Sequence, residues 1–238
     1  MRLGAAIPIL NEWRFLPAVA GQLLQIVDKV VLMRGSSSQS GAPVTRLLPI
    51  PELDQRIEVL EGNWTNEADT RNAGMNYLQD CDYVFMVDSD EILVDRDLRT
   101  LKEMCDSGLH SAIAVHLFTY WKTPEYRIEP PEDGTIKMVL RGDVRLVGVR
   151  EIRERFTTAD VWCRHLSYVR TDEEAREKMR LSGHAREIRP DWYEQVWRAW
   201  DTNRNLENLH PVHPSAYRRA TRIADPELQE ALQRWGCA

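Results

Sequence analysis

The stretch Tyr83–Val94, YVFMVDSDEILV, constrains the fold of this chain more than any other part of the sequence. It opens with five residues, Tyr83–Val87, that carry neither a charge nor a turn former, and the acidic cluster 88–91 follows at once. An uncharged run of this length is typical of a strand buried on both faces of a mostly parallel sheet. Ligands bind at the carboxyl ends of strands in open α/β sheets, so the sequence places a candidate site directly after Val87.

Asp88 and Asp90 are the first candidate ligands of this site. In extended backbone, residues two apart share one face of a strand, which would bring the two carboxylates together. Two carboxylates held this close share a proton or a cation. Hard oxygen ligands suit Mg²⁺ or Mn²⁺ bound together with a substrate phosphate. An acidic turn without any ligand is the alternative explanation of the same residues.

The remaining segments alternate apolar runs with amphipathic ones. Strands are expected over Leu3–Ile9, Val30–Met33, Ile57–Leu60 and Ser111–Phe118, and a β pair over Thr135–Leu140 and Val144–Val149. Helices are expected over Phe15–Val27, from Asn66 to about Leu78, over Asp95–Asp106, and from a capping box at Thr171 to about His184. This alternation predicts the α/β class, with a mostly parallel sheet flanked by helices.

Composition narrows the class of protein further. A hydrophobic content of 43% over 238 residues supports a real core in one large domain with a helical appendage. The net charge of −6 argues against a dedicated nucleic-acid binder. The four cysteines show neither metal-binding nor disulfide spacing, which favours a reducing, cytoplasmic compartment. The apolar run Leu3–Leu10 is too short to span a membrane, and no cleavage pattern follows it.

Three motifs stand in register along the first half of the chain. They are IPILNE at Ile7–Glu12, RNAG at Arg71–Gly74, and the D-x-D of Asp88–Asp90. In this combination the chain resembles the family two glycosyltransferases of the GT-A fold, well over residues 5–94 and more loosely to about 185. The resemblance implies a Rossmann-like GT-A domain and a hexosyltransferase that uses a nucleotide diphosphate sugar, with UDP as the default nucleotide.

The resemblance also implies which residues bind. The nucleotide sugar would be held by Pro8, Leu10, Asn11, Glu12, Arg71, Asp88, Ser89 and Arg170. The cofactor, Mn²⁺ or Mg²⁺, would be held by Asp88, Asp90 and His165, with His184 as a second choice for the histidine.

The end of the second strand departs from the family pattern. That strand usually ends in an Asp that accepts a hydrogen bond from the base, whereas here Arg34 and Gly35 follow Met33. A guanidinium cannot accept that bond, so the identity of the base stays open. The small-residue loop Arg34–Gly41 either cradles an anion or is a plain connector.

The acceptor side rests on three residues. The aromatic pair Tyr120 and Trp121 either stacks on the acceptor or packs in the core. Glu151 follows the second predicted strand of the β pair, where related enzymes often carry His–Glu, and is therefore the candidate catalytic base of an inverting reaction. A salt-bridging surface residue is the alternative for Glu151.

The domain boundaries follow from these assignments. Residues 1–189 would form the GT-A domain, with 1–94 as the nucleotide-binding half and 95–189 as the acceptor half. Residues 190–238 would form a helical extension packed on that domain, with Trp192, Trp197 and Trp200 on one helix face and Asp225–Pro226 starting a final helix. A lid over the acceptor is the alternative role of this tail.

The predicted function is metal-dependent transfer of a sugar to a hydroxyl acceptor. The acceptor is left open among a glycan, a lipid-linked sugar and a hydroxylated modified base in DNA, and no oligomeric state is predicted. Residues 137–189 carry 13 basic against 9 acidic side chains and would face the diphosphate or an anionic acceptor. The alternatives are a nucleotidyltransferase and a non-catalytic module that binds sugar nucleotides or glycans.

Overall fold

The structure is a computed structural model that describes residues 1–38, 40, 42, 44, 53–64 and 66–237. The strands are β1 (Leu3–Ile9), β2 (Lys29–Gly35), β3 (Ile57–Gly62), β4 (Tyr83–Met86), β5 (Glu91–Ile92), β6 (Ala112–Trp121), β7 (Thr123–Glu129), β8 (Ile136–Arg141), β9 (Leu146–Gly148), β10 (Glu151–Ile152), β11 (Thr157–Tyr168) and β12 (Arg219–Arg222). The helices are α1 (Leu16–Leu23), α2 (Glu67–Tyr77), α3 (Asp95–Asp106), α4 (Asp172–Leu181), α5 (Pro226–Arg234), the π-helix η1 (Tyr193–Arg198), and the 3₁₀ helices η2 (Ala199–Asp201) and η3 (Pro214–Ala216).

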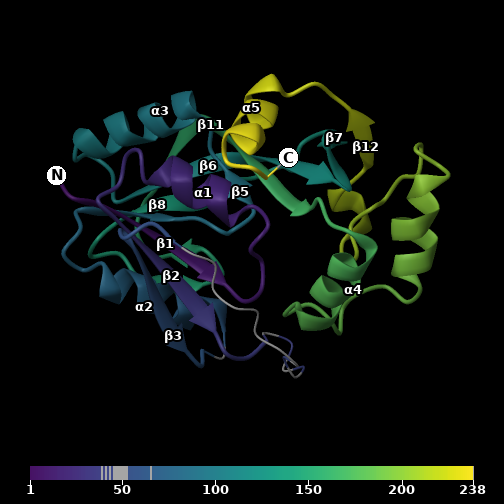
Figure 1. Cartoon of the computed structure of the whole chain (residues 1–238), viewed down its shortest axis with the longest axis horizontal. Helices are drawn as coiled ribbons and strands as arrows, with labels where there is room; N and C mark the ends of the chain where they lie inside the picture. Colours follow the sequence, from purple (N-terminus) through teal and green to yellow (C-terminus); the bar gives the residue numbers. More distant parts are fainter. Residues whose placement is uncertain (39, 41, 43, 45–52, 65, 238) are drawn as a thin grey trace.

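One mixed sheet organises the molecule (Figure 1). Its order runs β12-β7-β6-β8-β4-β1-β2-β3, with β11 paired to β6 and to β5. Strands β3, β2, β1 and β4 are parallel to one another, and β8 joins the parallel set antiparallel to β4. The predicted α/β class with parallel core strands flanked by helices is confirmed.

Alternating side chains of the central strands point into two hydrophobic layers, one on each face of the sheet. Tyr83 and Phe85 of β4 pack in the layer that α1, α3 and α5 cover, whereas Val84 and Met86 pack in the layer that α2 covers. All four side chains are at most 3% exposed, as expected for a strand buried on both faces. The uncharged run in the sequence therefore has a direct physical cause: both faces of β4 lie under helices.

Side-chain caps fix the starts of three helices at the predicted residues. Asn66 accepts a hydrogen bond from the backbone N–H of Asp69, and Asp225 accepts one from Leu228. Thr171 and Glu174 form a complete capping box at the start of α4. That helix ends at Leu181, three residues before the predicted end.

The predicted pairing of Thr135–Leu140 with Val144–Val149 is wrong. Strand β8 lies between β4 and β6 and is antiparallel to both, while β9 forms a small separate hairpin with β10. The apolar residues Val139 and Leu140 are fully buried, and a central place in the large sheet covers them better than a two-stranded ribbon could.

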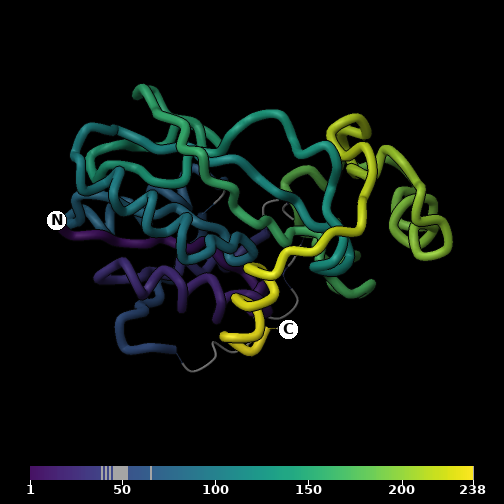
Figure 2. The backbone as a smooth tube through the Cα atoms, turned by 90° about the horizontal axis from the view of Figure 1, so that it is seen from above, coloured from purple at the N-terminus to yellow at the C-terminus, as the bar shows by residue number. Residues whose placement is uncertain are grey.

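The tail 190–237 packs closely against the rest of the protein. Trp192, Trp197 and Trp200 are at most 2% exposed and pack around the ring of Trp121, which confirms the predicted apolar face. The chain then returns across the molecule, adds β12 antiparallel to β7, and ends in α5 beside α1 (Figure 2). The strand β12 was not predicted, because four residues that include two exposed arginines show no apolar alternation.

Two further expectations concern the environment of the chain. No helix among the described residues is long and apolar enough to cross a bilayer. The four cysteines are free and buried.

A histidine in the tail gives a testable pH dependence. The Nδ1 atom of His210 accepts hydrogen bonds from the backbone N–H groups of Val212 and His213, at 3.1 and 2.8 Å. Burial, with a further contribution from His213, lowers the pKa of His210 to about 4. The folded state thus keeps His210 neutral while the unfolded chain takes up a proton below about pH 6.5, so stability is lost as the pH falls from about 6.5 to 4.

The variant His210→Asn is expected to make this loss shallower, by at most about 1.4 kcal/mol per pH unit, because the amide oxygen still accepts a hydrogen bond but does not titrate. Urea unfolding at a series of pH values measures the slope. His110→Asn, at a histidine outside the tail, is the matched control. The same slope in wild type and His210→Asn would contradict the assignment.

Candidate active site

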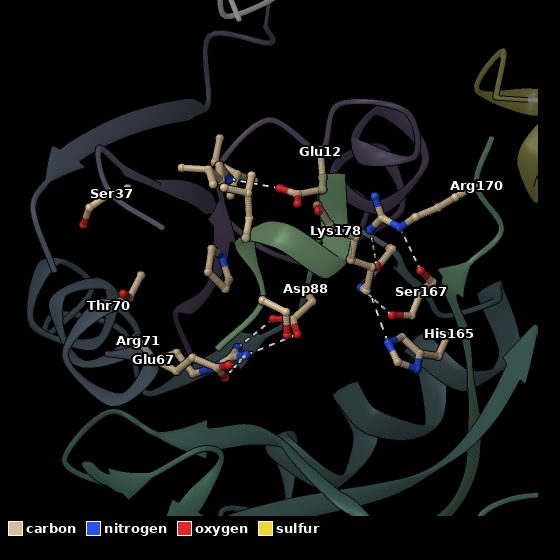
Figure 3. Close-up of a pocket in the computed structure, with 18 residues that line it drawn as sticks. Glu12, Ser37, Glu67, Thr70, Arg71, Asp88, His165, Ser167, Arg170 and Lys178 are labelled. Atoms are coloured by element: carbon tan, nitrogen blue, oxygen red, sulfur yellow. Dashed lines mark hydrogen bonds and ion pairs between the residues drawn. The ribbon is translucent and has the colours of Figure 1, made fainter. Parts of the chain in front are cut away.

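A polar cavity of about 280 Å³ opens at the carboxyl ends of β1 and β4 (Figure 3). Nine residues predicted from the sequence line it together: Pro8, Leu10, Glu12, Arg71, Asp88, Ser89, Asp90, His165 and Arg170. They come from the end of β1, from α2, from the turn after β4, from β11 and from the segment before α4. The sheet thus gathers side chains from distant parts of the sequence at the edge where α/β proteins bind ligands.

Asp88 lies between two arginines on one side of this cavity. Arg71 donates to both carboxylate oxygens of Asp88, at 2.7 and 3.1 Å, and Arg150 Nη2 lies 3.2 Å from Oδ2. Burial opposes ionisation of Asp88, but Arg150 and Arg71 outweigh it and hold the pKa of this carboxyl well below its ordinary value. Asp88 therefore stays ionised, and its bidentate pair with Arg71 fixes the guanidinium at the cavity wall.

Arg150 and Glu91 complete the buried part of this charge cluster. Arg150 donates to Glu91 Oε2 at 2.6 Å, and the same oxygen accepts the backbone N–H of Asp88 at 2.8 Å. Burial, and less strongly Asp88, raises the pKa of Glu91. Arg150 has a backbone φ of +51°, a region that non-glycine residues adopt at a cost. Neither residue was predicted as part of the site. The available signal was the Arg150–Glu151 pair, at the position where the glycosyltransferases that the sequence resembles often carry His–Glu.

Asp90 lies on the other side, among basic side chains. Its Oδ2 atom is 3.3 Å from Arg170 Nη2 and 4.0 Å from Lys178 Nζ, and its Oδ1 atom is 3.9 Å from His165 Nε2. Burial opposes ionisation of Asp90, but Lys178, His165 and Arg170 outweigh it and lower the pKa of this carboxyl. Lys178 of α4 was not singled out from the sequence. It lies seven residues after the capping Thr171, two helical turns along α4.

Asp88 and Asp90 do not share one face of a strand, as the sequence suggested. Strand β4 ends at Met86, and Ser89–Asp90 forms a turn before β5. The turn sends Asp88 toward Arg71 and Asp90 toward His165. The two carboxylates therefore contact different partner sets, which divides the cavity into two parts.

Asp90 and His165 are the two side chains of this cavity that could together bind a divalent cation. Two atoms that each bind one ion at roughly 2.1 Å stand at most about 4.2 Å apart, and Asp90 Oδ1 and His165 Nε2 are 3.9 Å apart. Among the described residues, no group of three or more His, Cys, Asp or Glu side chains could hold an ion by itself. An ion held by these two side chains would need further ligands, and substrate oxygens are the kind of ligand that Mg²⁺ accepts.

A second cavity, of about 810 Å³, adjoins the first. It lies against α4 and the segment 11–15, and it includes Asn11. The two cavities share the side chains Glu12, Ser89, Asp90, Arg170, Lys178 and Leu181. Asp90 thus stands where the two spaces meet.

The end of β2 and the loop after it border the first cavity through Gly35 and Ser37. Ser37 donates to the Asn63 side chain at 2.8 Å. Arg34 turns toward Glu61, 3.2 Å away, and lines neither cavity. Gln39 and Gly41, the end of the predicted small-residue loop, lie outside the described residues.

Comparisons with known proteins give a distant structural likeness. No protein-family model matches the sequence, and no curated protein is similar to it. The chain is similar to the crystal structure of S. aureus TarS 1-349, with a TM-score of 0.44 and 11% identity over 70% of this chain and 61% of that chain. The complexes of the same fragment with UDP-GlcNAc and with UDP give TM-scores of 0.44 and 0.45, each at 12% identity over 76% of this chain.

The chain spans less than two thirds of that fragment, since the three alignments cover 61–65% of it. A likeness at this level assigns neither a ligand nor a reaction to the present chain. The chemistry of the cavity must therefore come from its own side chains.

The aromatic pair Tyr120 and Trp121, for which the sequence left open acceptor stacking or core packing, lies in the core. Tyr120 and Trp121 are both 0% exposed, Tyr120 donates to Asp225 at 2.5 Å, and the Trp121 ring is surrounded by the tryptophans of the tail. A ring without exposed surface cannot stack on a ligand, so the stacking expectation is corrected. His184, the second-choice metal ligand, is exposed, lies 3.2 Å from Glu187 and lines neither cavity.

Glu151 lies next to Arg150 but does not reach either cavity. Its side chain is exposed and packs over Gly148 across the β9–β10 hairpin. We therefore expect Glu151→Gln to change turnover by less than about 10-fold, because loss of a general base costs about 10² or more. Steady-state kinetics with a donor-binding control measure this. A fall of that larger size with donor binding unchanged would restore Glu151 as the base.

Proposed function

We propose that this protein is a metal-dependent glycosyltransferase that moves a sugar from a nucleotide diphosphate sugar, UDP by default, to a hydroxyl acceptor. The observation that carries the proposal is that the two aspartates contact different sets of side chains. Asp88 is fixed by Arg71, whereas Asp90 faces His165, Arg170 and Lys178 at the junction of two cavities. This arrangement provides an anion site beside a cation site, as a metal-bound diphosphate requires.

The first cavity would hold the nucleotide. Pro8 and Leu10 at the end of β1, with Gly35 at the end of β2, provide a partly apolar wall for the base and ribose. Arg71 faces the cavity with its guanidinium already oriented by Asp88, so little entropy is lost when it binds a phosphate. Arg170 and Lys178 would neutralise the diphosphate from the opposite side.

The cation site would be Asp90 and His165. When bound there, a divalent ion would neutralise the negative charge that develops on the departing diphosphate. The His165 side chain is 19% exposed and that of Asp90 11%, so both reach the cavity while most of their surface is dry. The partial exclusion of water from these side chains strengthens each charge interaction in the site.

The second cavity would receive the transferred sugar and the acceptor. In the transfer, the acceptor oxygen forms a bond to the anomeric carbon as the bond from that carbon to the phosphate oxygen breaks. The hydroxyl proton passes to a carboxylate base and the nucleotide diphosphate leaves. Glu12 and Asp90 are the described carboxylates that line both cavities. A bound cation would occupy Asp90, and Glu151 lies outside both cavities. The base therefore has to be identified by substituting the carboxylates that line the cavities and measuring turnover.

The acceptor class can be narrowed by a salt series. Of the basic residues in 137–189, Arg150 and Arg164 are buried against carboxylates, and Arg170 and Lys178 face the cavities. The 9 acidic side chains of this segment offset most of its 13 basic ones, and the whole chain has a net charge of −6, so we expect the acceptor Michaelis constant to respond weakly to salt. A steep rise with salt would indicate counterion release and a nucleic-acid acceptor.

Nucleotide-sugar turnover tests the function itself. Purified protein is given a panel of UDP-hexoses with Mn²⁺, and UDP release is followed with and without candidate acceptors. The proposal predicts UDP release that needs the divalent cation. Binding without turnover would indicate a non-catalytic module, and pyrophosphate release from a nucleoside triphosphate and a sugar phosphate would indicate a nucleotidyltransferase. Either result would overturn the proposal.

A further inference from the structure

A chain of polar side chains leads away from His165 into the protein. His165 on β11 and Thr119 on β6 are paired residues of two parallel strands. His165 Nδ1 lies 3.4 Å from Thr119 Oγ1, and Thr119 Oγ1 lies 2.6 Å from Glu132 Oε1. Thr119 is 1% exposed, so its hydroxyl must find its partners within the protein.

The Thr119 hydroxyl has a single proton to donate. A carboxylate can only accept, so in the contact with Glu132 the hydroxyl is the donor, and the 2.6 Å distance is typical of a bond to a charged acceptor. Toward His165, the Thr119 oxygen can then only accept. A hydrogen bond across this 3.4 Å contact therefore requires a proton on the Nδ1 atom of His165.

The other ring nitrogen is fixed as a consequence. In neutral histidine only one nitrogen is protonated, and the hydrogen bond of that nitrogen decides which one it is. With the proton on Nδ1, the lone pair of Nε2 points toward Asp90 Oδ1, 3.9 Å away. That separation is too long for a hydrogen bond and lies within the roughly 4.2 Å that two ligand atoms of one ion can span.

Tyr217 closes the network from the tail. Its hydroxyl lies near the side chains of Thr119 and Glu132, and the residue is 4% exposed. The phenol has one proton of its own, which satisfies Glu132 or Thr119 without supplying a donor to His165. On its inward side, His165 Nδ1 thus faces the Thr119 oxygen, whose own proton goes to Glu132.

We propose that Thr119 and Glu132 are positioning residues that hold His165 in the Nδ1–H tautomer and so keep Nε2 ready to bind a cation. The cation half of this inference rests on the proposed function, whereas the tautomer half rests on the contacts alone. Histidine side chains in water favour the opposite tautomer, with the proton on Nε2. Residues that orient a ligating histidine through its second nitrogen typically change metal affinity by about 10- to 100-fold.

The tautomer can be read directly in the cation-free protein. Nitrogen chemical shifts of ¹⁵N-histidine-labelled protein, recorded at pH 8 and assigned with a His165→Gln variant, distinguish a protonated from an unprotonated ring nitrogen. Wild type is expected to show His165 with Nδ1 protonated and Nε2 unprotonated. A proton on Nε2 in wild type would overturn the proposal, whatever the variants do.

Two variants test the chain of contacts. Thr119→Val removes the hydroxyl with little change in shape and is expected to shift His165 toward Nε2–H, whereas Thr119→Ser keeps the hydroxyl and should keep the wild-type tautomer. Glu132→Gln has an amide that can donate to Thr119, which frees the hydroxyl proton to turn toward His165. An unchanged tautomer in both Thr119→Val and Glu132→Gln would overturn the positioning role.

Mn²⁺ affinity is the second readout. The spin-resonance signal of free Mn²⁺, measured in the presence of UDP, gives the bound fraction without any turnover. Thr119→Val and Glu132→Gln are expected to weaken Mn²⁺ binding about 10- to 100-fold. The control Thr158→Val, at an exposed position near the start of β11, should leave Mn²⁺ binding unchanged. Wild-type affinity in the two variants would overturn the positioning role. A wild type that binds no Mn²⁺ would overturn the proposed function and the cation half, while the nitrogen shifts still decide the tautomer.

Discussion

The variant Asp90→Asn is expected to lose Mn²⁺-dependent turnover by at least about 10²-fold, because a charge-stabilising contact in the transition state is worth that much. The amide keeps the shape of the carboxylate, but it removes the charge between His165, Arg170 and Lys178. UDP binding in the absence of the cation should persist, since the basic side chains remain. Turnover of the UDP-sugar and calorimetric binding of UDP measure the two effects separately.

Asp80→Asn is the matched control for this variant. Asp80 forms an exposed ion pair with Arg2 at 2.5 Å, and both side chains are 51% exposed. Exposed pairs contribute little to stability, so this variant should behave as wild type in every assay. Full turnover of Asp90→Asn, or full wild-type turnover in EDTA, would contradict the assignment of Asp90 to a cation.

The variant Arg164→Met is expected to lower the free energy of unfolding by about 3–5 kcal/mol, the usual cost of breaking a buried ion pair from one side. Arg164 has a side chain only 3% exposed and donates to Asp97 of α3 at 2.5 Å and to Asp225 at 3.3 Å. It also reaches Glu227 of α5 at 3.0 Å. Methionine would leave Asp97 and Asp225 buried without their cation.

Urea unfolding followed by circular dichroism measures this loss. The control is Arg222→Met on β12, whose pair with Glu125 is 73% and 52% exposed and should contribute less than about 1 kcal/mol. A similar small loss in both variants would show that Arg164 does not hold α3, α5 and β11 together. Because α5 belongs to the tail, the same result would also show that the contact between the tail and β11 contributes little to the free energy of unfolding.

The parallel core could be predicted because burial on both faces leaves a plain mark in the sequence. Tyr83–Val87 needs no polar residue, since α1 and α3 cover one face of β4 and α2 covers the other. Caps were equally readable, because an Asn or Thr that satisfies a free N–H acts within three residues. These signals are local, and the structure retains them.

Long-range pairing left weaker marks. Strand β8 has the apolar pattern of a hairpin partner for the next segment, yet it lies between β4 and β6, a choice decided by the burial of Val139 and Leu140. Strand β12 has almost no apolar pattern, and its place depends on the edge that β7 leaves open. Neither choice can be read from the segment itself.

The site shows the same division. Nine of the candidate residues predicted from the sequence line one cavity, because motifs at the ends of β1 and β4 meet at one edge of the sheet. The resemblance missed Arg150 and Lys178, which reach the aspartates from a separate hairpin and from α4. It also placed Tyr120 and Trp121 at the acceptor, because an aromatic pair looks the same in sequence whether it lines a cleft or packs against a tail.

Calorimetric titration of UDP into the wild-type protein, once with Mn²⁺ and once with EDTA, tests most directly whether the cavity holds a diphosphate and a cation together. The proposed function predicts binding at least about 10-fold tighter with Mn²⁺, a gain of about 1.4 kcal/mol, and predicts that Asp90→Asn loses this gain. Equal affinity in Mn²⁺ and EDTA, or no binding of UDP in either, would contradict it.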